Sequence, residues 1–224
     1  SSESVGLLDT AGHVSIRNPS NPNSYFVATA APGSVTDKDI IERDFTKGGP
    51  DTMGLSIDDE IFKANPNVNA VLYSRSPDVA VFSQGVALRP VVNGAAFIGD
   101  GLPIFNMSTL DPKVPVLSNP AFGKGVAAAL GKKQGVLLSG HGVVMTGRSV
   151  YNVTGNSYQL RQNARILQMA ISLRGKVTHL NDIPVPPEPA AEAALSPQGN
   201  GGARQLGPPE GRDWVYWAQT TPVD

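Results

Sequence analysis

Three residues of the sequence have side chains suited to acid–base chemistry and anion binding: Tyr73, Arg75 and His141. Tyr73 and Arg75 are two positions apart at the end of a short apolar run, and alternate residues of a β-strand point to the same face of a sheet. A guanidinium holds a carboxylate or another oxyanion, a phenol can donate or relay a proton, and an imidazole can act as a general acid or base. Side chains of these types, where they lie together, are suited to hold a small oxygenated compound.

The segments around these residues predict an α/β fold. Residues 68–72 form a nearly continuous apolar run, which is typical of a strand buried on both faces. Residues 135–138 predict another strand that leads into Gly140-His141-Gly142, and residues 143–145 lead out of that turn. The longest expected helix has apolar residues at helical spacing along one face. Helices are expected over residues 56–65, 79–83, 122–130 and 149–173, and Gly131 is the expected cap after the third of these.

Other stretches predict shorter elements. Residues 5–31 predict two strands around a turn rich in asparagine and proline. Thr36 begins a predicted helix, because acidic residues follow it in the first turn. Residues 86–106 predict short strands separated by glycine.

The composition changes after Gly175. Residues 181–224 are too rich in proline and glycine to predict a packed domain, so we expect an extended arm after a domain over residues 1–180. Its aromatic cluster, Trp214 to Trp217, is expected to dock on the domain or on a neighbouring subunit.

Composition also excludes several classes of function. The chain has 224 residues and a net charge of −1, so it lacks the long-range field that attracts nucleic acids or anionic membranes. No apolar run is long enough to span a bilayer. Cysteine is absent, which excludes disulfides and thiolate chemistry. We expect a cytoplasmic protein or, if an N-terminal signal has been removed, a secreted one.

Stretches in four places, taken in order, resemble the class II aldolase/adducin family. They are Gly12-His-Val-Ser-Ile-Arg17, residues 66–77, Leu138–Gly147 and the long helix that follows. Three segments are most similar to the decarboxylase-like branch of the family: the sequence around His13, residues 31–39 and the Trp-x-x-Trp tail. The resemblance implies a three-layer α/β/α domain with a mixed central sheet, assembled as a homo-oligomer, usually a tetramer. It also implies active sites between subunits, around a divalent metal.

The resemblance further implies which residues hold that metal. In the family these are a glutamate, the histidines of a His-x-His pair and the histidine of a His-Gly pair, and the ion stabilises an enolate as a Lewis acid. Here the matching positions are Gly54, Tyr73, Arg75 and His141. One histidine does not make a metal site, and an arginine repels the ion. We therefore expect no metal cofactor. The alternative is a weak divalent-metal site that Asp58 or Glu60 forms with His141.

Arg75 would then supply the positive charge that the ion supplies in the family. The alternative is that activity has been lost and Arg75 merely pairs with an acidic neighbour. Six further residues at positions that match the family's pocket or its tail are expected to bind substrate: His13, Thr29, Asp58, Asn93, Trp214 and Tyr216. For His13 the alternative is a structural bond to the backbone.

Three functions stay open from the sequence. The first is a metal-independent lyase or cyclase that acts on a small carbonyl or carboxylate compound, such as an intermediate of secondary metabolism. The second is a residual metal-dependent decarboxylase or aldolase, and the third is a non-catalytic binding or structural module like adducin. A polar pocket favours an enzyme, whereas a pocket filled by apolar side chains favours the module.

Overall fold

The fold is built around a mixed sheet of seven strands. The structure, a computed structural model, describes residues 7–9, 11–47, 54–114, 116 and 119–174. The strand order is β3-β2-β1-β4-β7-β6-β5, and all neighbours are antiparallel except β5 and β6, which are parallel. The strands are β1 (His13–Arg17), β2 (Ser24–Ala28), β3 (Ile40–Asp44), β4 (Ala70–Ser74), β5 (Ile104–Phe105), β6 (Gly135–Leu138) and β7 (Gly142–Gly147).

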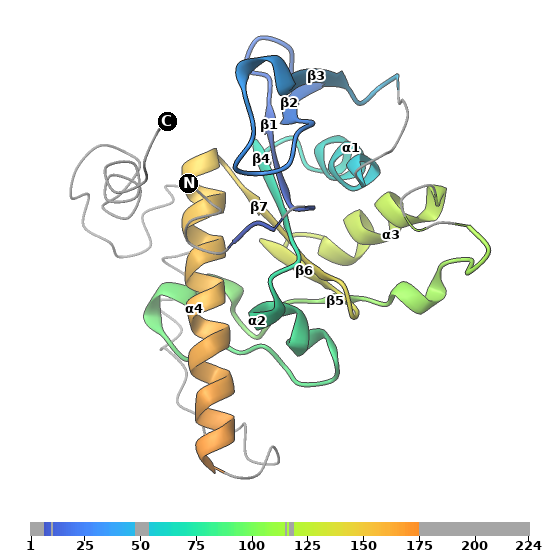
Figure 1. The fold of residues 1–224 in the computed structure, drawn as a ribbon. Helices are drawn as coiled ribbons and strands as arrows, with labels where there is room; N and C mark the ends of the chain where they lie inside the picture. Colours follow the sequence, from blue (N-terminus) through green and yellow to red (C-terminus); the bar gives the residue numbers. More distant parts are fainter. Residues whose placement is uncertain (1–6, 10, 48–53, 115, 117–118, 175–224) are drawn as a thin grey trace.

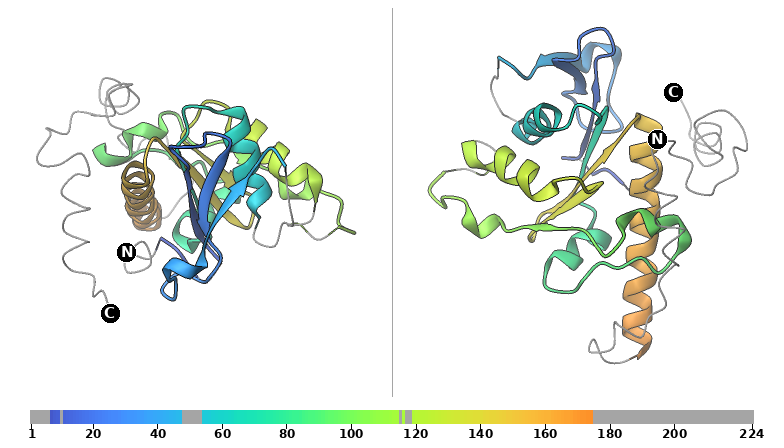
Figure 2. Two further views of the ribbon diagram at one scale, coloured as in Figure 1. Left: turned by 90° about the horizontal axis from the view of Figure 1, so that it is seen from above. Right: turned by 180° about the vertical axis from the view of Figure 1, so that it is seen from behind.

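Helices cover the two faces of this sheet (Figure 1). Seen from above, α4 lies on one side of the strands and α1 and α3 lie on the other (Figure 2). The α-helices are α1 (Leu55–Ala64), α2 (Pro77–Ala80), α3 (Pro120–Leu130) and α4 (Val150–Arg174), and the 3-10 helices are η1 (Asp37–Asp39), η2 (Val81–Ser83), η3 (Asn93–Ile98) and η4 (Met107–Thr109). The prediction of a three-layer α/β/α fold with a mixed sheet is confirmed.

β4 is buried on both faces, as its apolar run predicts. Val71 and Tyr73 point into the core under α1 and α3, whereas Ala70 and Leu72 point into the core under α4. Successive side chains of a strand alternate between faces, so a strand between two helical layers needs apolar residues at every position. Tyr73 therefore brings a phenol into this largely apolar layer, which also holds the phenol of Tyr25.

Four strand ends meet at one place. His13, the first residue of β1, pairs with Tyr73 on β4, and Ser74, the last residue of β4, pairs with Val143 on β7. β6 ends at Leu138 and β7 begins at Gly142, so His141 lies in the turn between them. Strand pairing thus brings together residues that are far apart in the sequence.

The prediction of short strands over residues 86–106 is largely wrong. Only Ile104–Phe105 forms a strand, which pairs with β6. Upstream of it, Asn93–Ile98 forms the 3-10 helix η3, whose buried residues from Ala95 to Ile98 pack in the layer of α4. Burial against α4 satisfies this apolar stretch without a place in the sheet, so its tertiary setting overrides its local preference for a strand.

The predicted helix after Thr36 is also wrong beyond one turn. Asp39 accepts hydrogen bonds from the backbone and side chain of Thr36, so the expected capping interaction forms. The helical turn nevertheless lasts only three residues, because Ile40 and Ile41 pair with β2 as the start of β3. Branched side chains of this type suit a strand better than a helix.

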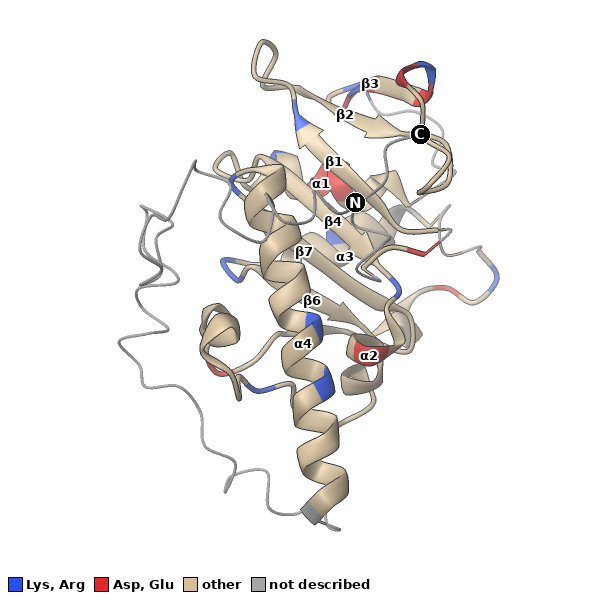
Figure 3. Ribbon diagram, turned by 60° about the vertical axis from the view of Figure 1, so that its left-hand side comes forward, with Lys and Arg blue, Asp and Glu red and all other residues tan. Residues whose placement is uncertain are grey.

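The composition predicts no strongly charged surface and no membrane-spanning segment. Charged residues lie scattered over the described part of the chain (Figure 3), in agreement with the small net charge. No helix among the described residues is long and apolar enough to cross a membrane. The predicted arm over residues 181–224, with its aromatic cluster, lies outside the described residues.

The contact between α3 and α1 provides a test of the fold. A Cβ added to Gly123 of α3 would lie 2.1 Å from the carbonyl oxygen of Ser56 in α1. We expect Gly123→Ala to push the helices apart and to lower the free energy of unfolding by about 2 kcal/mol, measured by chemical denaturation.

The control is Gly155→Ala in α4, where an added Cβ meets no atom within 4 Å. Alanine is the better helix former, so this change is expected to leave the free energy of unfolding unchanged or to raise it by up to about 1 kcal/mol. Equal losses in the two variants would contradict the packing described for α1 and α3.

Candidate active site

Tyr73 lies at the centre of a row of three rings. Its ring centroid is 5.5 Å from that of His13 and 6.0 Å from that of His141. The residue is only 6% exposed, and burial raises the pKa of its phenol to about 12, with Arg75 lowering it and Asp9 raising it. Among the described residues its hydroxyl has no hydrogen-bond partner. The phenol thus keeps its proton at neutral pH and has it available to a ligand.

His141 owes its place to the glycines on either side. Gly140 has φ +68°, a conformation that other residues rarely adopt, and its N–H donates to the Ser83 hydroxyl oxygen. A Cβ on Gly142 would lie 2.2 Å from the carbonyl oxygen of Ser74, so only glycine lets this turn lie against the end of β4. Burial, followed by the charge of Arg75, lowers the pKa of His141, which favours a neutral imidazole.

Arg75 follows β4 directly and forms an ion pair at the rim of the site. Its Nε donates to Oδ2 of Asp9 at 2.9 Å, and both side chains are about two-fifths exposed. This is the acidic neighbour that the alternative interpretation of Arg75 expects. The terminal nitrogens Nη1 and Nη2, however, have no protein partner in the part of the chain that is described. Arg75 therefore keeps donors for an anionic ligand.

Asp9 is the site residue that the sequence analysis missed. Partial burial acts to raise its pKa, but hydrogen bonds from Arg75 and from the backbone of Ala11, with the charge of Arg75, lower it overall. Oδ1 of Asp9 also accepts from the N–H of Gly12. An aspartate whose side chain can accept from backbone N–H groups two or three residues further on, shortly before a glycine, is a known signal for a turn. That signal finds the turn, but it does not reveal the contact with Arg75.

His13 belongs to a buried polar group behind this row. Its Nε2 lies 2.8 Å from Oδ2 of Asp58, and the Ser15 hydroxyl donates to the same oxygen at 2.5 Å. Asp58, in α1, is fully buried. His13 is thus bonded to a carboxylate and not to the backbone, and the group ties β1 to α1. We therefore propose for His13 and Asp58 a supporting role behind Tyr73, in place of direct contact with substrate.

The other expected substrate-binding residues are not gathered here. Thr29 is exposed at the end of β2, where its hydroxyl donates to the carbonyl oxygen of Asp39. Asn93 is exposed on η3, which packs in the α4 layer, whereas Tyr73 faces the α1 and α3 layer. Trp214 and Tyr216 lie outside the described residues.

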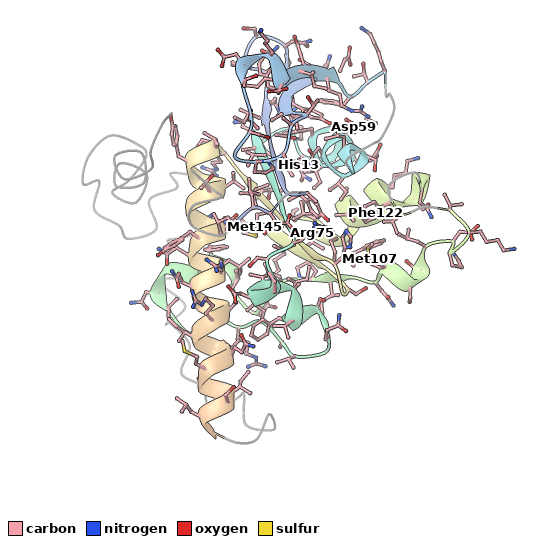
Figure 4. The ribbon with its side chains drawn as sticks, viewed as in Figure 1. His13, Asp59, Arg75, Met107, Phe122 and Met145 are labelled. Atoms are coloured by element: carbon pink, nitrogen blue, oxygen red, sulfur yellow. The ribbon has the colours of Figure 1, made fainter. Side chains whose placement is uncertain are left out.

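Figure 4 shows His13 and Arg75 near the centre of the molecule, between the helical layers.

The sequence matches a known family over most of the described chain. The family profile described as Class II Aldolase and Adducin N-terminal domain matches residues 7–168. This protein belongs to that family. The match begins just before Asp9 and ends within α4, so the row of rings lies inside it.

Relatives and solved structures agree with this assignment. Decarboxylase tropJ of Talaromyces stipitatus is 27% identical over 189 residues, which are 75% of this chain and 71% of the relative. The 3,4-dihydroxyphthalate decarboxylase of Rhodococcus jostii is 24% identical over 161 residues, which are 66% of this chain and 64% of the relative. Both names agree with the predicted decarboxylase-like branch of the family.

Two solved structures show the same fold. An aldolase II superfamily protein from Pseudomonas syringae has a TM-score of 0.69 at 21% identity, covering 95% of this chain and 84% of its own. L-fuculose-1-phosphate aldolase from Thermus thermophilus has a TM-score of 0.63 at 19% identity, covering 77% of this chain and 90% of its own.

The residues at the positions of the family's metal ligands do not fit a divalent ion. Gly54 supplies no side chain and takes φ +78° at the start of α1, a conformation unfavourable for a glutamate. Tyr73 and Arg75 stand where the resemblance predicts the histidine pair, and a guanidinium repels a cation. Asp58, the carboxylate offered as an alternative ligand, is already bonded to His13. Within the described ranges no three His, Asp or Glu side chains gather as a metal site.

A separate cavity lies on the other side of the sheet. It has a volume of about 360 Å³ and lies beside β5, on the side of the sheet covered by α4. None of Tyr73, Arg75 and His141 lines it. Its walls are mostly apolar, with one ion pair between Lys133 and Asp100. We therefore do not assign the candidate active site to this cavity. The lining residues are Phe82, Ala87, Leu88, Asp100, Gly101, Leu102, Pro103, Ile104, Lys133 and Leu137.

The buried group around Asp58 gives a prediction about stability. We expect Asp58→Ala to lower the free energy of unfolding by about 3 kcal/mol, because it leaves His13 and Ser15 without their buried acceptor. Chemical denaturation measures this loss. Glu60→Gln on the same helix removes a partly exposed pair with Lys63 and is expected to cost less than about 0.5 kcal/mol. A small loss in Asp58→Ala would show that the buried group contributes little.

The pKa of Tyr73 gives a second prediction. At about pH 10 an ordinary tyrosine is half ionised, whereas Tyr73, with a pKa of about 12, stays protonated because burial disfavours its phenolate. The ultraviolet difference spectrum between the wild type and Tyr73→Phe is therefore expected to show no phenolate signal for Tyr73 at that pH. Ionisation of Tyr73 at or below about pH 10 would contradict the burial described for its ring.

Proposed function

We propose that this protein is a lyase that removes a carboxyl group from, or cleaves a carbon–carbon bond in, a small oxygenated carboxylate compound without a divalent metal. The observation that carries the proposal is the cluster of Tyr73, Arg75 and His141. The rings of Tyr73 and His141 lie 6.0 Å apart, and apart from the bond of Arg75 Nε to Asp9 the side-chain donors and acceptors of the three residues have no partners among the described residues. Polar groups left without protein partners beside one another are suited to hold a ligand.

The chemistry assigned to each group follows from its charge and protonation. When the bond to the carboxyl carbon breaks, CO₂ leaves and its bonding electrons stay on the substrate, where an adjacent carbonyl accepts them as an enolate. Arg75 stabilises that oxyanion with Nη1 and Nη2, in the place of a metal. Tyr73, which keeps its proton at neutral pH, protonates the carbon. Neutral His141 then accepts a proton from water at one ring nitrogen while its other ring N–H donates to the phenolate, and the hydroxide left behind combines with CO₂ as hydrogencarbonate. Mass and charge balance, with no oxidant or reductant.

Two relatives support the choice of reaction. Both are named decarboxylases, one of them for a dihydroxylated aromatic dicarboxylate. We therefore propose hydroxylated aromatic acids and related carbonyl acids as the substrate class. In a hydroxylated aromatic acid the proton transfer from Tyr73 to the ring carbon comes first and turns the ionised neighbouring ring hydroxyl into the carbonyl, which accepts the electrons when CO₂ leaves. A cyclase would use the same enolate as an internal nucleophile, so product analysis separates the two reactions. A place in secondary metabolism and assembly as a homo-oligomer, usually a tetramer in the family, stay predictions.

The proposal is tested by turnover of a panel of hydroxylated aromatic carboxylates, followed as CO₂ release. The protein is first treated with a chelator, and elemental analysis confirms that no stoichiometric metal remains. We expect turnover to persist, and Tyr73→Phe and Arg75→Ala each to lower kcat/KM by about a hundredfold or more. Arg75→Lys keeps the charge but loses the fork of donors, so an intermediate loss is expected.

Lys63→Gln on the surface of α1 is the control and is expected to leave turnover unchanged. Unchanged turnover in both Tyr73→Phe and Arg75→Ala would overturn the proposal. Activity that disappears with the chelator and returns with a divalent ion would instead support the metal-dependent alternative.

A further inference from the structure

The N-terminal segment places a carboxylate at the rim of the site. The Ser74 hydroxyl, at the end of β4, donates to the carbonyl oxygen of Leu7, and the Leu7 residue is only 2% exposed. A Cβ on Gly12 would lie 3.0 Å from the carbonyl oxygen of Tyr73, so the segment crosses β4 at backbone contact. Asp9 lies between these two fixed points, and its carboxylate has a defined position.

The two carboxylate oxygens of Asp9 have different tasks. Oδ1 accepts hydrogen bonds from the N–H groups of Ala11 and Gly12, each at 3.0 Å. Oδ2 accepts from Nε of Arg75 at 2.9 Å. Arg75 has five N–H donors, and its contact with Asp9 uses the one on Nε. An anionic ligand is left with the Nη1 and Nη2 groups, beside a carboxylate that is already present.

The ion pair of Asp9 with Arg75 is not explained by a contribution to the free energy of unfolding. Both side chains are about two-fifths exposed, and exposed pairs of this kind contribute little to the free energy of unfolding. Asp9 and Arg75 do, however, act on the same two groups of the site. Arg75 lowers the pKa of Tyr73 and of His141, and Asp9 raises both. Oδ2 of Asp9 lies 2.9 Å from Nε of Arg75, so the carboxylate lies beside the guanidinium at the rim of the site.

Among the residues that the structure describes, no second cation forms an ion pair with the Asp9 carboxylate. Within the described chain, Arg75 is the only cation whose charge shifts the pKa of Tyr73 or of His141. A ligand with one anionic group can pair with the guanidinium of Arg75. A second carboxylate on the same ligand would lie near Asp9 without a positive partner. The repulsion between the two negative charges selects against such a ligand.

We propose that Asp9 is a specificity-determining residue, which restricts the anion site at Arg75 to ligands with a single carboxylate and rejects dicarboxylates. This inference rests on the proposed function, since it requires Arg75 to bind an anionic group of the substrate. It adds that the charge of the ligand is selected by the N-terminal segment, which precedes every strand of the sheet.

The test compares the binding of benzoate and phthalate by calorimetry at about pH 8, where carboxyl groups are fully ionised. We expect the wild type to bind benzoate more tightly than phthalate. Asp9→Asn keeps an oxygen for the N–H groups of Ala11 and Gly12 but removes the charge. It is expected to raise the affinity for phthalate on the order of tenfold relative to benzoate, because one repulsive charge is removed. Arg75→Gln is expected to abolish the binding of both.

Two further variants serve as controls. Asp100→Asn makes the same change in net charge at the pair with Lys133, away from the site, and is expected to leave the ratio of affinities unchanged. Asp9→Ser also removes the charge and offers a hydroxyl oxygen to the turn, so it gives the same reading if Asp9→Asn is poorly folded. Thermal unfolding establishes which variants are folded.

The outcomes separate the two claims. If benzoate binding depends on Arg75 but the ratio of affinities stays the same without the charge of Asp9, the role of Asp9 is wrong and the anion site stands. If neither ligand binds in a way that depends on Arg75, the proposed anion site fails and the selectivity proposal fails with it.

Discussion

The close approach of three backbones at the end of β4 is the constraint on which the site depends. The N-terminal segment crosses β4 at Gly12, and the turn that carries His141 meets it at Gly142, where a Cβ would lie 2.2 Å from the Ser74 carbonyl oxygen. Side chains larger than hydrogen would separate these segments by several tenths of an ångström or more. The row formed by His13, Tyr73 and His141 exists because glycines remove the atoms that would keep it apart.

The site joins a protonated phenol, a neutral imidazole and one guanidinium. Burial keeps Tyr73 protonated and disfavours the charged form of His141, so Arg75 carries the positive charge. In the family that charge comes from an ion held by several ligands. A guanidinium binds an oxyanion through directed hydrogen bonds and does so without any further ligands. The replacements at Gly54, Tyr73 and Arg75 are therefore consistent with one another, because a site that binds through Arg75 has no use for the missing ligands.

Much of the fold and part of the site were predictable from local patterns. The apolar run of β4 indicates a strand buried on both faces, because a side chain's polarity is matched to its own degree of burial. For the same reason, the helical spacing of apolar residues in α4 indicates one buried face. Residues 86–106 were mispredicted because Ala95–Ile98 are buried against α4 and not in the sheet. The start of β3 was mispredicted because pairing with β2 outweighs the capping interaction of Thr36.

The sequence by itself determined the family and the layered fold, because these depend on residue types at fixed spacings; the replacement of the metal ligands stays a prediction from the same patterns. Only the tertiary structure decided the partners of the charged groups. The pairs of Arg75 with Asp9 and of His13 with Asp58 join segments distant in sequence, and no spacing rule connects such segments. The structure also separated Asn93 from Tyr73 by placing them in different layers. Ion pairs and layers depend on distance in space, and that distance is set only when the chain has closed around its sheet.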